Sequence, residues 1–520
     1  MSTHTYQRNT STRFRTVQSM LPVLLAILFG ASAAIPARAA DTILIVTTVA
    51  DLGGSCPGAN CTLRAAIAYA NAYPAQDQII GFNISGTCPQ TIKIFSALPT
   101  ITDTLSIRGY TQFGAAQNTS EIGDNATLCI QLQAASSGAH IATGLRFAPT
   151  DITDKFDVSG LSIGYGIDYA IRIEGGNYVI AGNFLGVAAD GTTVRLNAYD
   201  GVQVSASNSY FATTRVIGGT AVADRNLISG NGTGVSLVSG GGNVVRNNFI
   251  GTTRSGNSAL PNLVGIYASS VNNYFTNNVV SGNSHAGIRV ENPDSYSTIV
   301  QNRIGAKAFS FCVPPCTPDD ALGNGGDGVR IANGAAGSNV SGNLIAWNGG
   351  DGISLPDAGP QNGIYANVMH DNGGLGIDLG ADGVDANDND AAVPAGSPNL
   401  LLNYPVISSV GGSDESGIVL GTLQTTNGHY EIEFEADTDP DPSMHGEGRI
   451  YVGSGEVDIT NAPPGNNGFV NFALPISGSA LIGKHISAVA RNQNSNTSEF
   501  SLSQTYLFSD VIFANGFESP

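Results

Sequence analysis

The middle of the chain repeats a short unit that begins with asparagine, and this repeat limits the possible folds more than any other feature of the sequence. The leading asparagines are residues 226, 248, 278, 302, 343 and 367, at steps of 22, 30, 24, 41 and 24 residues. A unit of about two dozen residues is too short for a pair of helices and is typical of one coil of a parallel β-solenoid. The repeat therefore predicts an all-β, right-handed parallel β-helix.

A strand of the form Gly-[Ile/Val]-x-[apolar] follows each unit. These strands begin at Gly201, Gly234, Gly265, Gly287, Gly328, Gly352 and Gly376. We expect them to stack in one sheet, with Ile288, Val329 and Ile353 together in it. Because side chains alternate along a strand, the third residue of each pattern, written x, should point outward.

Two structural roles are expected for the repeated asparagines. Asparagine tolerates the left-handed backbone conformation of a tight turn. Asparagine side chains that stack at the strand spacing of about 4.8 Å also form hydrogen-bonded ladders. We favour these roles over a catalytic one.

Longer inserts follow the units of the Asn-x-x-Gly form, at residues 187–199, 252–264 and 306–327. Inserts on alternate coils would stack into a raised rim along one side of the solenoid, and such rims commonly line a binding face. Simple surface loops are the alternative interpretation.

The ends of the chain have different compositions. Residues 1–39 combine Arg8, Arg13 and Arg15 with an apolar run and an Ala37-Arg38-Ala39 site, which predicts a secretory signal peptide cleaved before Ala40. The helical pattern of 61–71, with Thr62 as N-cap, predicts an N-terminal capping helix within a cap at residues 40–100. We expect the β-helix at 101–380, an acidic linker at 381–403, a C-terminal β-sandwich at 404–508 and a short tail at 509–520.

The charge and the cysteines limit the compartment and the partners. The net charge is -19, and removal of the four arginines of residues 1–39 leaves -23. Such an acidic surface repels the phosphate backbone, so binding of nucleic acid is disfavoured. No second long apolar run follows residue 39, so no transmembrane segment is expected in the mature chain.

Six cysteines in an exported chain predict three disulfides, with Cys56–Cys61, Cys88–Cys129 and Cys312–Cys316 as the expected pairs.

The segment Cys61-Thr-Leu-Arg-Ala-Ala-Ile67 resembles the motif of the bacterial secreted proteins known as CSLREA proteins, although Ala65 replaces the usual glutamate. The likeness continues through the Ser-Gly-Asn coils, Gly376-Ile-Asp-Leu-Gly380 and Asn496-Thr-Ser-Glu-Phe500. It implies a secreted or cell-surface β-helix protein of the pectate-lyase-like superfamily, and it implies no particular reaction.

Two groups of residues are candidate sites. The outward positions of the repeated strands form a row that contains Tyr267, Arg289, Arg330 and Asp378, a candidate ligand-binding stripe. The carboxylates of Asp382, Asp385, Asp388 and Asp390 crowd one segment and suggest a Ca²⁺ site that rigidifies the junction with the sandwich. The alternatives are a solvated strand face and a solvated acidic linker.

No established catalytic cluster is found in the sequence. The aspartate triad with Gly-His-Gly of the polygalacturonase-like hydrolases and the Asp-Pro-His-Asp of the uronate epimerases are both absent from the sequence, and the single Trp347 argues against an aromatic sugar platform. We therefore expect a surface or secreted protein that binds an extracellular polysaccharide or a surface protein. A polysaccharide lyase or hydrolase and a structural spacer are the alternatives.

Overall fold

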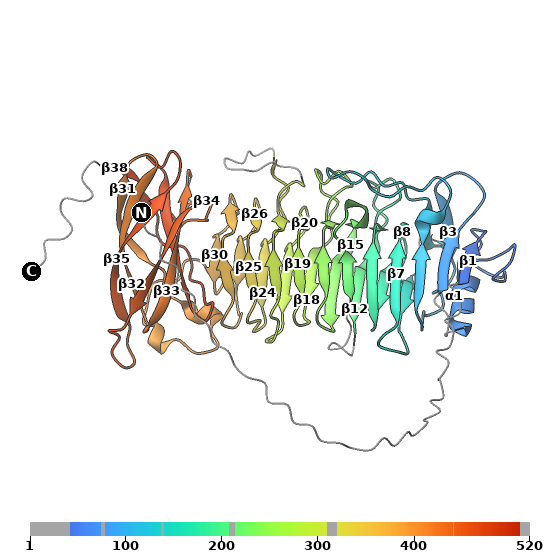
Figure 1. Ribbon diagram of the computed structural model, residues 1–520, viewed down its shortest axis with the longest axis horizontal. Helices are drawn as coiled ribbons and strands as arrows, with labels where there is room; N and C mark the ends of the chain where they lie inside the picture. The colour runs from blue at the N-terminus through green and yellow to red at the C-terminus, as the bar shows by residue number, and fades with distance from the viewer. Residues whose placement is uncertain are drawn as a thin grey trace, which may run out of the picture. The chain divides into compact units, whose positions relative to one another are not determined.

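A computed structural model describes residues 42–73, 78–136, 140–206, 214–308, 320–439 and 441–509. The predicted signal peptide, the Cys312–Cys316 pair and all of the tail except Ser509 lie outside these residues. These described residues all belong to one compact unit. Its strands build a right-handed parallel β-helix followed by a β-sandwich, as predicted (Figure 1).

Three parallel sheets form the walls of the β-helix. Sheet A has eleven strands: β1 (Thr42–Val46), β2 (Gln78–Phe82), β4 (Leu105–Arg108), β7 (Lys155–Ser159), β10 (Asn177–Ala181), β13 (Arg215–Gly218), β16 (Val244–Arg246), β19 (Tyr274–Thr276), β22 (Thr298–Val300), β25 (Asn339–Ser341) and β28 (Gly363–Tyr365). Sheet B has ten: β3 (Gln90–Ile94), β5 (Ile130–Ala134), β8 (Leu161–Ile163), β11 (Phe184–Leu185), β14 (Leu227–Ile228), β17 (Phe249–Ile250), β20 (Val279–Val280), β23 (Arg303–Ile304), β26 (Leu344–Ala346) and β29 (Val368–His370). Sheet C has nine: β6 (Ile141–Phe147), β9 (Ile167–Ile173), β12 (Asn197–Ser205), β15 (Asn231–Ser239), β18 (Val264–Ala268), β21 (Ile288–Glu291), β24 (Val329–Ala332), β27 (Ile353–Leu355) and β30 (Ile377–Leu379). Strands β1, β2 and β3 fall within the predicted cap and already pair with these sheets.

The repeated Gly-[Ile/Val]-x-[apolar] strands stack in sheet C, as the sequence predicted. Ile288 pairs with Val329, and Val329 pairs with Ile353. All three side chains are fully buried in the core enclosed by the three sheets. Each coil adds one isoleucine, valine or leucine to the same internal column, so the core grows by repetition along the axis.

Two continuous ladders of buried asparagines run along the corners of the solenoid. In the first, the side-chain nitrogen of each asparagine donates to the side-chain oxygen of the next, at 2.9–3.2 Å. Its members are Asn183, Asn226, Asn248, Asn278, Asn302, Asn343 and Asn367. The second ladder joins Asn197, Asn231, Asn262, Asn283, Asn324, Asn348 and Asn372 in the same way. The predicted ladder is therefore confirmed.

The left-handed backbone conformation belongs to a different residue from the one expected. It is the residue just before the ladder asparagine that has positive φ in several coils, as at Asn277, Gln301 and Ala366. The ladder asparagines do not have positive φ. The preceding residue turns the chain, which leaves the ladder side chain free to point along the stack.

Helix α1 (Leu63–Ala72) covers the N-terminal end of the core. Leu63, Ile67 and Ala70 are buried in it, and the Thr62 hydroxyl accepts a hydrogen bond from the Ala65 N–H at 3.1 Å, as an N-cap does. Disulfides Cys56–Cys61 and Cys88–Cys129 form as predicted. The open first coil is thus covered and crosslinked.

The C-terminal sandwich consists of two four-stranded sheets. Sheet D contains β31 (Val406–Gly412), β32 (Ser416–Thr425), β35 (Gly468–Ser477) and β38 (Leu507–Phe508). Sheet E contains β33 (Gly428–Asp437), β34 (Ile450–Ile459), β36 (His485–Asn492) and β37 (Gln504–Thr505). Between β-helix and sandwich lie two short 3-10 helices, η4 (Asp390–Ala392) and η5 (Pro398–Leu401). Tyr430, Ile432 and Phe434 point into the sandwich core, as the alternation of β33 predicted.

The sandwich covers the C-terminal end of the solenoid core. Val489 and Phe500 belong to the same apolar cluster as the solenoid isoleucines. The Glu447 carboxylate accepts hydrogen bonds from the Asn372 N–H at 3.1 Å and from its side-chain nitrogen at 3.0 Å. Within the second ladder the next asparagine fills that position, so Glu447 ends the ladder where an eighth asparagine would otherwise be needed.

Removing one member of the first ladder should destabilise the protein strongly. In Asn278→Ala, the Asn248 N–H and side-chain nitrogen lose their common acceptor. Because each buried polar group left unpaired costs about 1–3 kcal/mol, we expect a loss of roughly 2 kcal/mol or more in the free energy of unfolding. Denaturant unfolding of this variant and of Asn257→Ala, an exposed asparagine in an insert, measures the difference. Equal losses in both variants would contradict the structural role of the ladder.

Candidate functional site

The outward row on sheet C has the register that the sequence predicted. Tyr267 pairs with Arg289, Arg289 with Arg330, Arg330 with Ser354, and Ser354 with Asp378. The side chains of Arg289 and Arg330 are 42% and 36% exposed. Ser354 and Asp378 are buried. The Ser354 hydroxyl donates to Asp327, and Asp378 accepts from the Gly383 N–H at 3.2 Å. The accessible part of the row therefore ends at Arg330.

Each accessible arginine of the row is held by a carboxylate. Glu291 accepts from the Arg289 guanidinium and, at 3.0 Å, from the Tyr267 hydroxyl. Asp327 accepts from Arg330 at 3.2 Å and from the Ser354 hydroxyl at 2.7 Å. These contacts fix the side chains in place and leave further guanidinium N–H donors for a ligand.

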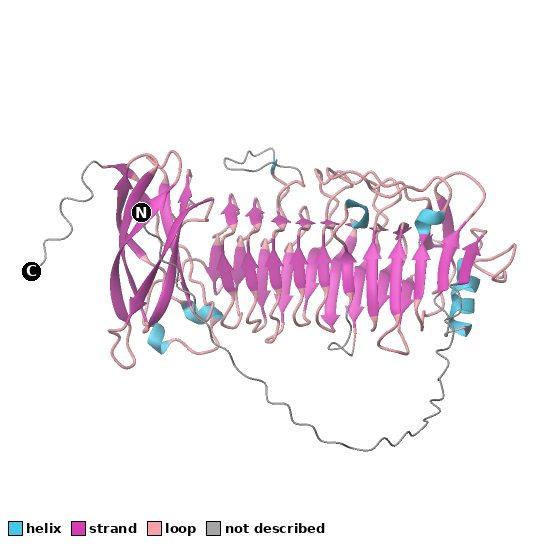
Figure 2. Ribbon diagram, viewed as in Figure 1, coloured by secondary structure: helices cyan, strands magenta, loops and turns pink. Residues whose placement is uncertain are grey.

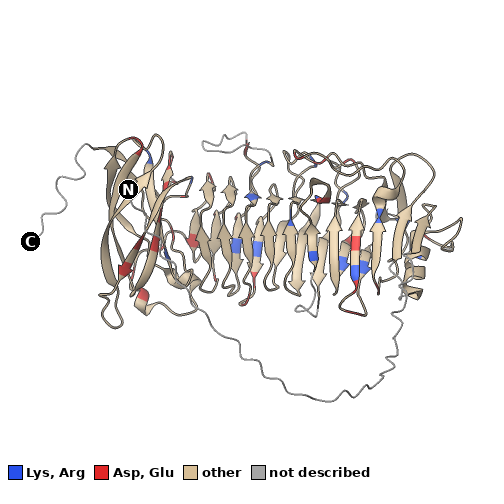
Figure 3. Ribbon diagram, viewed as in Figure 1, with Lys and Arg blue, Asp and Glu red and all other residues tan. Residues whose placement is uncertain are grey.

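The row continues toward the N-terminus to Gln203, the third residue of the repeated strand that begins at Gly201, and then to Arg172 and Arg146, which the sequence pattern did not indicate. Arg146 pairs with Arg172, and Arg172 pairs with Gln203. Because Ala170 stands where the repeat usually has glycine, the β9 strand did not match the pattern. Figure 3 shows basic residues on several solenoid strands, among them two neighbouring strands near β24.

Two tyrosines also meet on this face. The rings of Tyr169 and Tyr199 stack with their centroids 5.3 Å apart, and the Arg172 guanidinium lies 5.4 Å from the Tyr169 ring centre. The two tyrosines are thirty residues apart and come from neighbouring strands, β9 and β12. Sequence spacing gave no signal for this pair, since the β12 strand contains an irregular register at this point.

The inserts pack over sheet B and leave the outward row of sheet C accessible. Figure 2 shows loops gathered along one side of the solenoid. Beneath them, the outward side chains Phe184, Leu227 and Phe249 form a second apolar cluster with insert residues Val187 and Leu260. The rim is therefore a packed layer with its own core.

Three aspartates meet at the C-terminal end of the same face. Asp327 accepts from the Asp351 N–H at 3.2 Å, and Asp351 accepts from the Leu375 N–H at 2.9 Å, so the two carboxylates lie on successive coils. Burial and then the charges of Asp378 and Asp327 raise the pKa of Asp351 to about 6. The sequence did not reveal this group, because the aspartates are not in one motif.

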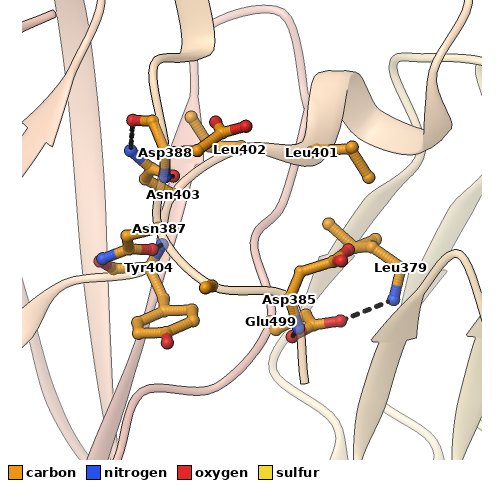
Figure 4. Close-up of a pocket in the computed structure, with 10 residues that line it drawn as sticks. Leu379, Asp385, Asn387, Asp388, Leu401, Leu402, Asn403, Tyr404 and Glu499 are labelled. Carbon is orange, nitrogen blue, oxygen red and sulfur yellow. Dashed lines mark hydrogen bonds between the residues drawn. The ribbon is translucent and has the colours of Figure 1, made fainter. Parts of the chain in front are cut away.

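A small acidic cavity of about 40 Å³ lies between the last coil and the sandwich. Figure 4 shows Asp385 and Glu499 on one side of it, near Leu379, with Asp388 and Asn403 on the other. Glu499 accepts hydrogen bonds from the N–H groups of Leu379 and Asp385, both at 2.9 Å. Burial, and to a lesser extent the charges of Asp385 and Asp378, raises the pKa of Glu499 to about 8.

Of the four predicted calcium ligands, Asp385 and Asp388 line this cavity, and Asp382 and Asp390 do not. Asp382 and Asp385 both approach Gly380, near Asp378, whereas Asp390 lies by Thr425. One buried oxygen of Asp378 and one of Asp385 lack a hydrogen-bond partner, which suits an oxygen-coordinated cation. Yet no three His, Cys, Asp or Glu side chains of the described residues converge as a metal site. The calcium site stays a prediction.

These features define an acidic, right-handed parallel β-helix protein with an end-capping sandwich and an ordered polar face on sheet C. The family model described as "Periplasmic copper-binding protein (NosD)" matches residues 169–377, within the solenoid. No significant match is found among curated proteins. None of the helices in the described part of the chain is long and apolar enough to cross a membrane.

Three solved structures are similar in fold. Pectate lyase Pel9A is 16% identical, with 64% of this chain and 71% of that chain covered and a TM-score of 0.29. The enzymatically active domain of bacteriophage CBA120 tailspike protein 2 is 10% identical over 87% and 75%, with a TM-score of 0.30. The tailspike protein of Acinetobacter phage vB_ApiP_P1 is 12% identical over 87% and 88%, with a TM-score of 0.25. At these identities and TM-scores the matches do not bear on activity.

The junction should lose stability as the pH rises. Burial raises the pKa of Glu447 and of Glu499 to about 8, above the ordinary value of 4.5. Between these pH values the folded protein keeps protons that the unfolded chain releases, so the free energy of unfolding falls from pH 4.5 to pH 8. Thermal unfolding should therefore begin at a lower temperature at pH 8.5 than at pH 5.

Glu447→Gln tests the source of this dependence, because an amide oxygen can accept the same hydrogen bonds without titrating. The variant should show a smaller pH dependence of the unfolding midpoint than wild type. Glu415→Gln, an exposed change in the sandwich, should leave it as in wild type. A wild-type pH dependence in Glu447→Gln would show that this carboxyl does not contribute.

Calcium, if it binds the junction, should stabilise it most where the carboxylates are charged. A site of micromolar affinity at about 1,000-fold excess calcium would add about 4 kcal/mol to the folded state. The measurement is the unfolding midpoint with calcium or with a chelator, at pH 8 and pH 5, for wild type and Asp385→Asn. Identical midpoints with calcium and chelator at pH 8 would contradict the site.

Proposed function

We propose that this protein is exported and that the outward face of sheet C binds an extracellular glycan. The observation that carries the proposal is the row of Tyr267, Arg289 and Arg330, three successive cross-strand neighbours whose polar groups are held in place and accessible. Tyrosine offers a flat apolar face with a polar tip, and arginine offers planar donors for hydroxyl groups. Two disulfides support export, because disulfides persist in oxidising compartments.

An ordered array of this kind suits binding of a chain molecule. The sheet repeats its outward positions at about 4.8 Å per coil, so successive groups lie along one line. Because each arginine is already oriented by Glu291 or Asp327, little side-chain entropy is lost when a ligand binds. A long polymer lying along the solenoid axis would contact several coils at once.

The name of the matching family model includes copper binding, and our proposal does not extend this property to the chain. Among the described residues no three His, Cys, Asp or Glu side chains converge as a metal site. Four of the cysteines are engaged in disulfides.

A polysaccharide hydrolase or lyase is the second candidate, and the aspartate group favours it. Asp351 has a pKa raised to about 6, chiefly by burial, beside Asp327 and Asp378. A carboxyl group with such a pKa can act as an acid or a base near neutral pH. Assays for new reducing ends and unsaturated products on the bound glycan, with wild type and Asp351→Asn, test this candidate. Equal amounts of product from wild type and Asp351→Asn would contradict a catalytic role for Asp351.

A glycan array with the mature protein tests the binding function. Loss of a hydrogen bond to a charged group costs about 1.5–3 kcal/mol, so Arg289→Ala and Arg330→Ala should each weaken binding by roughly ten- to hundredfold. Arg246→Ala, which removes a half-buried arginine from sheet A, is the matched control. Ser354 is not a suitable control, because it is buried and bonded to Asp327.

The unfolding midpoints of the arginine variants show whether each has kept its fold. Wild-type affinity in both folded variants would contradict the proposal. A mature protein that binds no glycan on the array would instead favour a structural role.

A further inference from the structure

The two arginine groups on sheet C carry no excess of positive charge, in a protein with a net charge of -19. Arg146 and Arg172 both contact Glu174, at 2.8 and 3.0 Å, and Asp200 lies nearby, buried. Farther along the face, Arg289 and Arg330 are matched by Glu291 and Asp327. Each group thus has at least as many carboxylates as arginines, because Asp351 and Asp378 also lie beside Asp327 at the second group.

The charge of these groups favours some classes of polysaccharide over others. A polyanionic chain would approach an acidic protein and meet arginines that are already neutralised by carboxylates. An uncharged chain meets no such repulsion, and its hydroxyl groups can both donate to the carboxylates and accept from the guanidinium groups. The face is therefore complementary to a neutral glycan.

The stacked tyrosines supply a second feature that a neutral glycan needs. Tyr199 is 55% exposed, and its ring is supported by Tyr169 at 5.3 Å. Beside the pair, the Gln203 side-chain nitrogen donates to Asp200 at 2.9 Å, which holds the amide in place on the outward surface. Arg172, Gln203 and the open face of Tyr199 thus combine polar groups with a flat apolar surface.

We infer that Tyr199, supported by Tyr169 and flanked by Arg172 and Gln203, forms a stacking subsite for a pyranose ring of a neutral glycan. This inference rests on the proposed glycan binding and extends it to a second position on the same face. Four strand steps, through β12, β15 and β18, separate Arg172 on β9 from Arg289 on β21. At about 4.8 Å per step the two groups lie roughly 19 Å apart along the axis.

Because of this separation, the affinity should depend on the length of the saccharide. A polysaccharide long enough to span both groups gains affinity from both, because the second contact becomes intramolecular. A short oligosaccharide reaches one group at a time. Removal of the Tyr199 ring should therefore weaken the binding of the long polysaccharide by a larger factor than it weakens the binding of a short oligosaccharide.

The experiment measures binding of dextran, galactomannan, xyloglucan and polygalacturonate, and of short oligosaccharides cut from any that bind. Tyr199→Ala should weaken binding of the long neutral chain tenfold or more, and Tyr199→Phe should bind nearly as wild type because the ring remains. Tyr274→Ala removes a tyrosine that is 41% exposed on sheet A, and it should not change binding. Unfolding midpoints confirm that the variants are folded.

The outcomes separate this inference from the proposed function. Wild-type affinity in Tyr199→Ala together with weak binding in Arg330→Ala would overturn the subsite and leave the proposed function intact. Wild-type affinity in both Tyr199→Ala and Arg330→Ala would overturn the subsite and the proposed glycan binding. Binding of polygalacturonate in preference to the three neutral polymers would overturn the assignment to a neutral glycan.

Discussion

The hydrogen bond between stacked asparagine side chains is the interaction on which the rest of the structure depends. A parallel solenoid must turn its backbone at each corner, and every turn buries polar groups that no strand can satisfy. In this protein each ladder asparagine pairs with the next coil, as Asn248 does with Asn278 at 3.0 Å, and also binds a backbone carbonyl. Because every coil needs the one after it, the stack has no natural end, and both ends must be closed by other parts of the chain.

The C-terminal closure explains the buried acidic groups. Glu447 accepts from Asn372 in place of another asparagine, and Glu499 accepts from the edge strand β30 at Leu379. A carboxylate is the simplest acceptor for two donors, but burial makes its charge costly, which is why both groups have pKa values near 8. The sandwich is thus joined to the solenoid through carboxyl groups whose burial costs least when they are protonated, so the stability of this junction depends on pH.

The proposed binding face follows from the same repetition. Stacking places outward residues in straight rows, so a few changes in a repeated strand create a line of arginines and tyrosines. The row is accessible because the inserts cover sheet B, where Phe184 and Phe249 are buried beneath them. Paired carboxylates such as Glu291 and Glu174 orient the arginines and cancel their charge. The face therefore offers oriented hydrogen-bonding groups without an excess of positive charge, and the proposed preference for a neutral glycan rests on this combination.

The sequence by itself determined the parts of this protein that repeat. The solenoid, the stacking of Ile288 with Val329 and the row through Tyr267, Arg289 and Arg330 all follow from a regular spacing, because one coil predicts the next. It also predicted the α1 cap, the two described disulfides and the inward side chains of β33. Only the tertiary structure decided what happens where the repeat is interrupted. Asn262 and Asn324 join the second ladder from near the ends of inserts of irregular length. Tyr169 and Tyr199 meet across a strand irregularity, and Glu447 reaches Asn372 from 75 residues away. Such contacts depend on the three-dimensional path of the chain, and no local pattern in the sequence encodes that path.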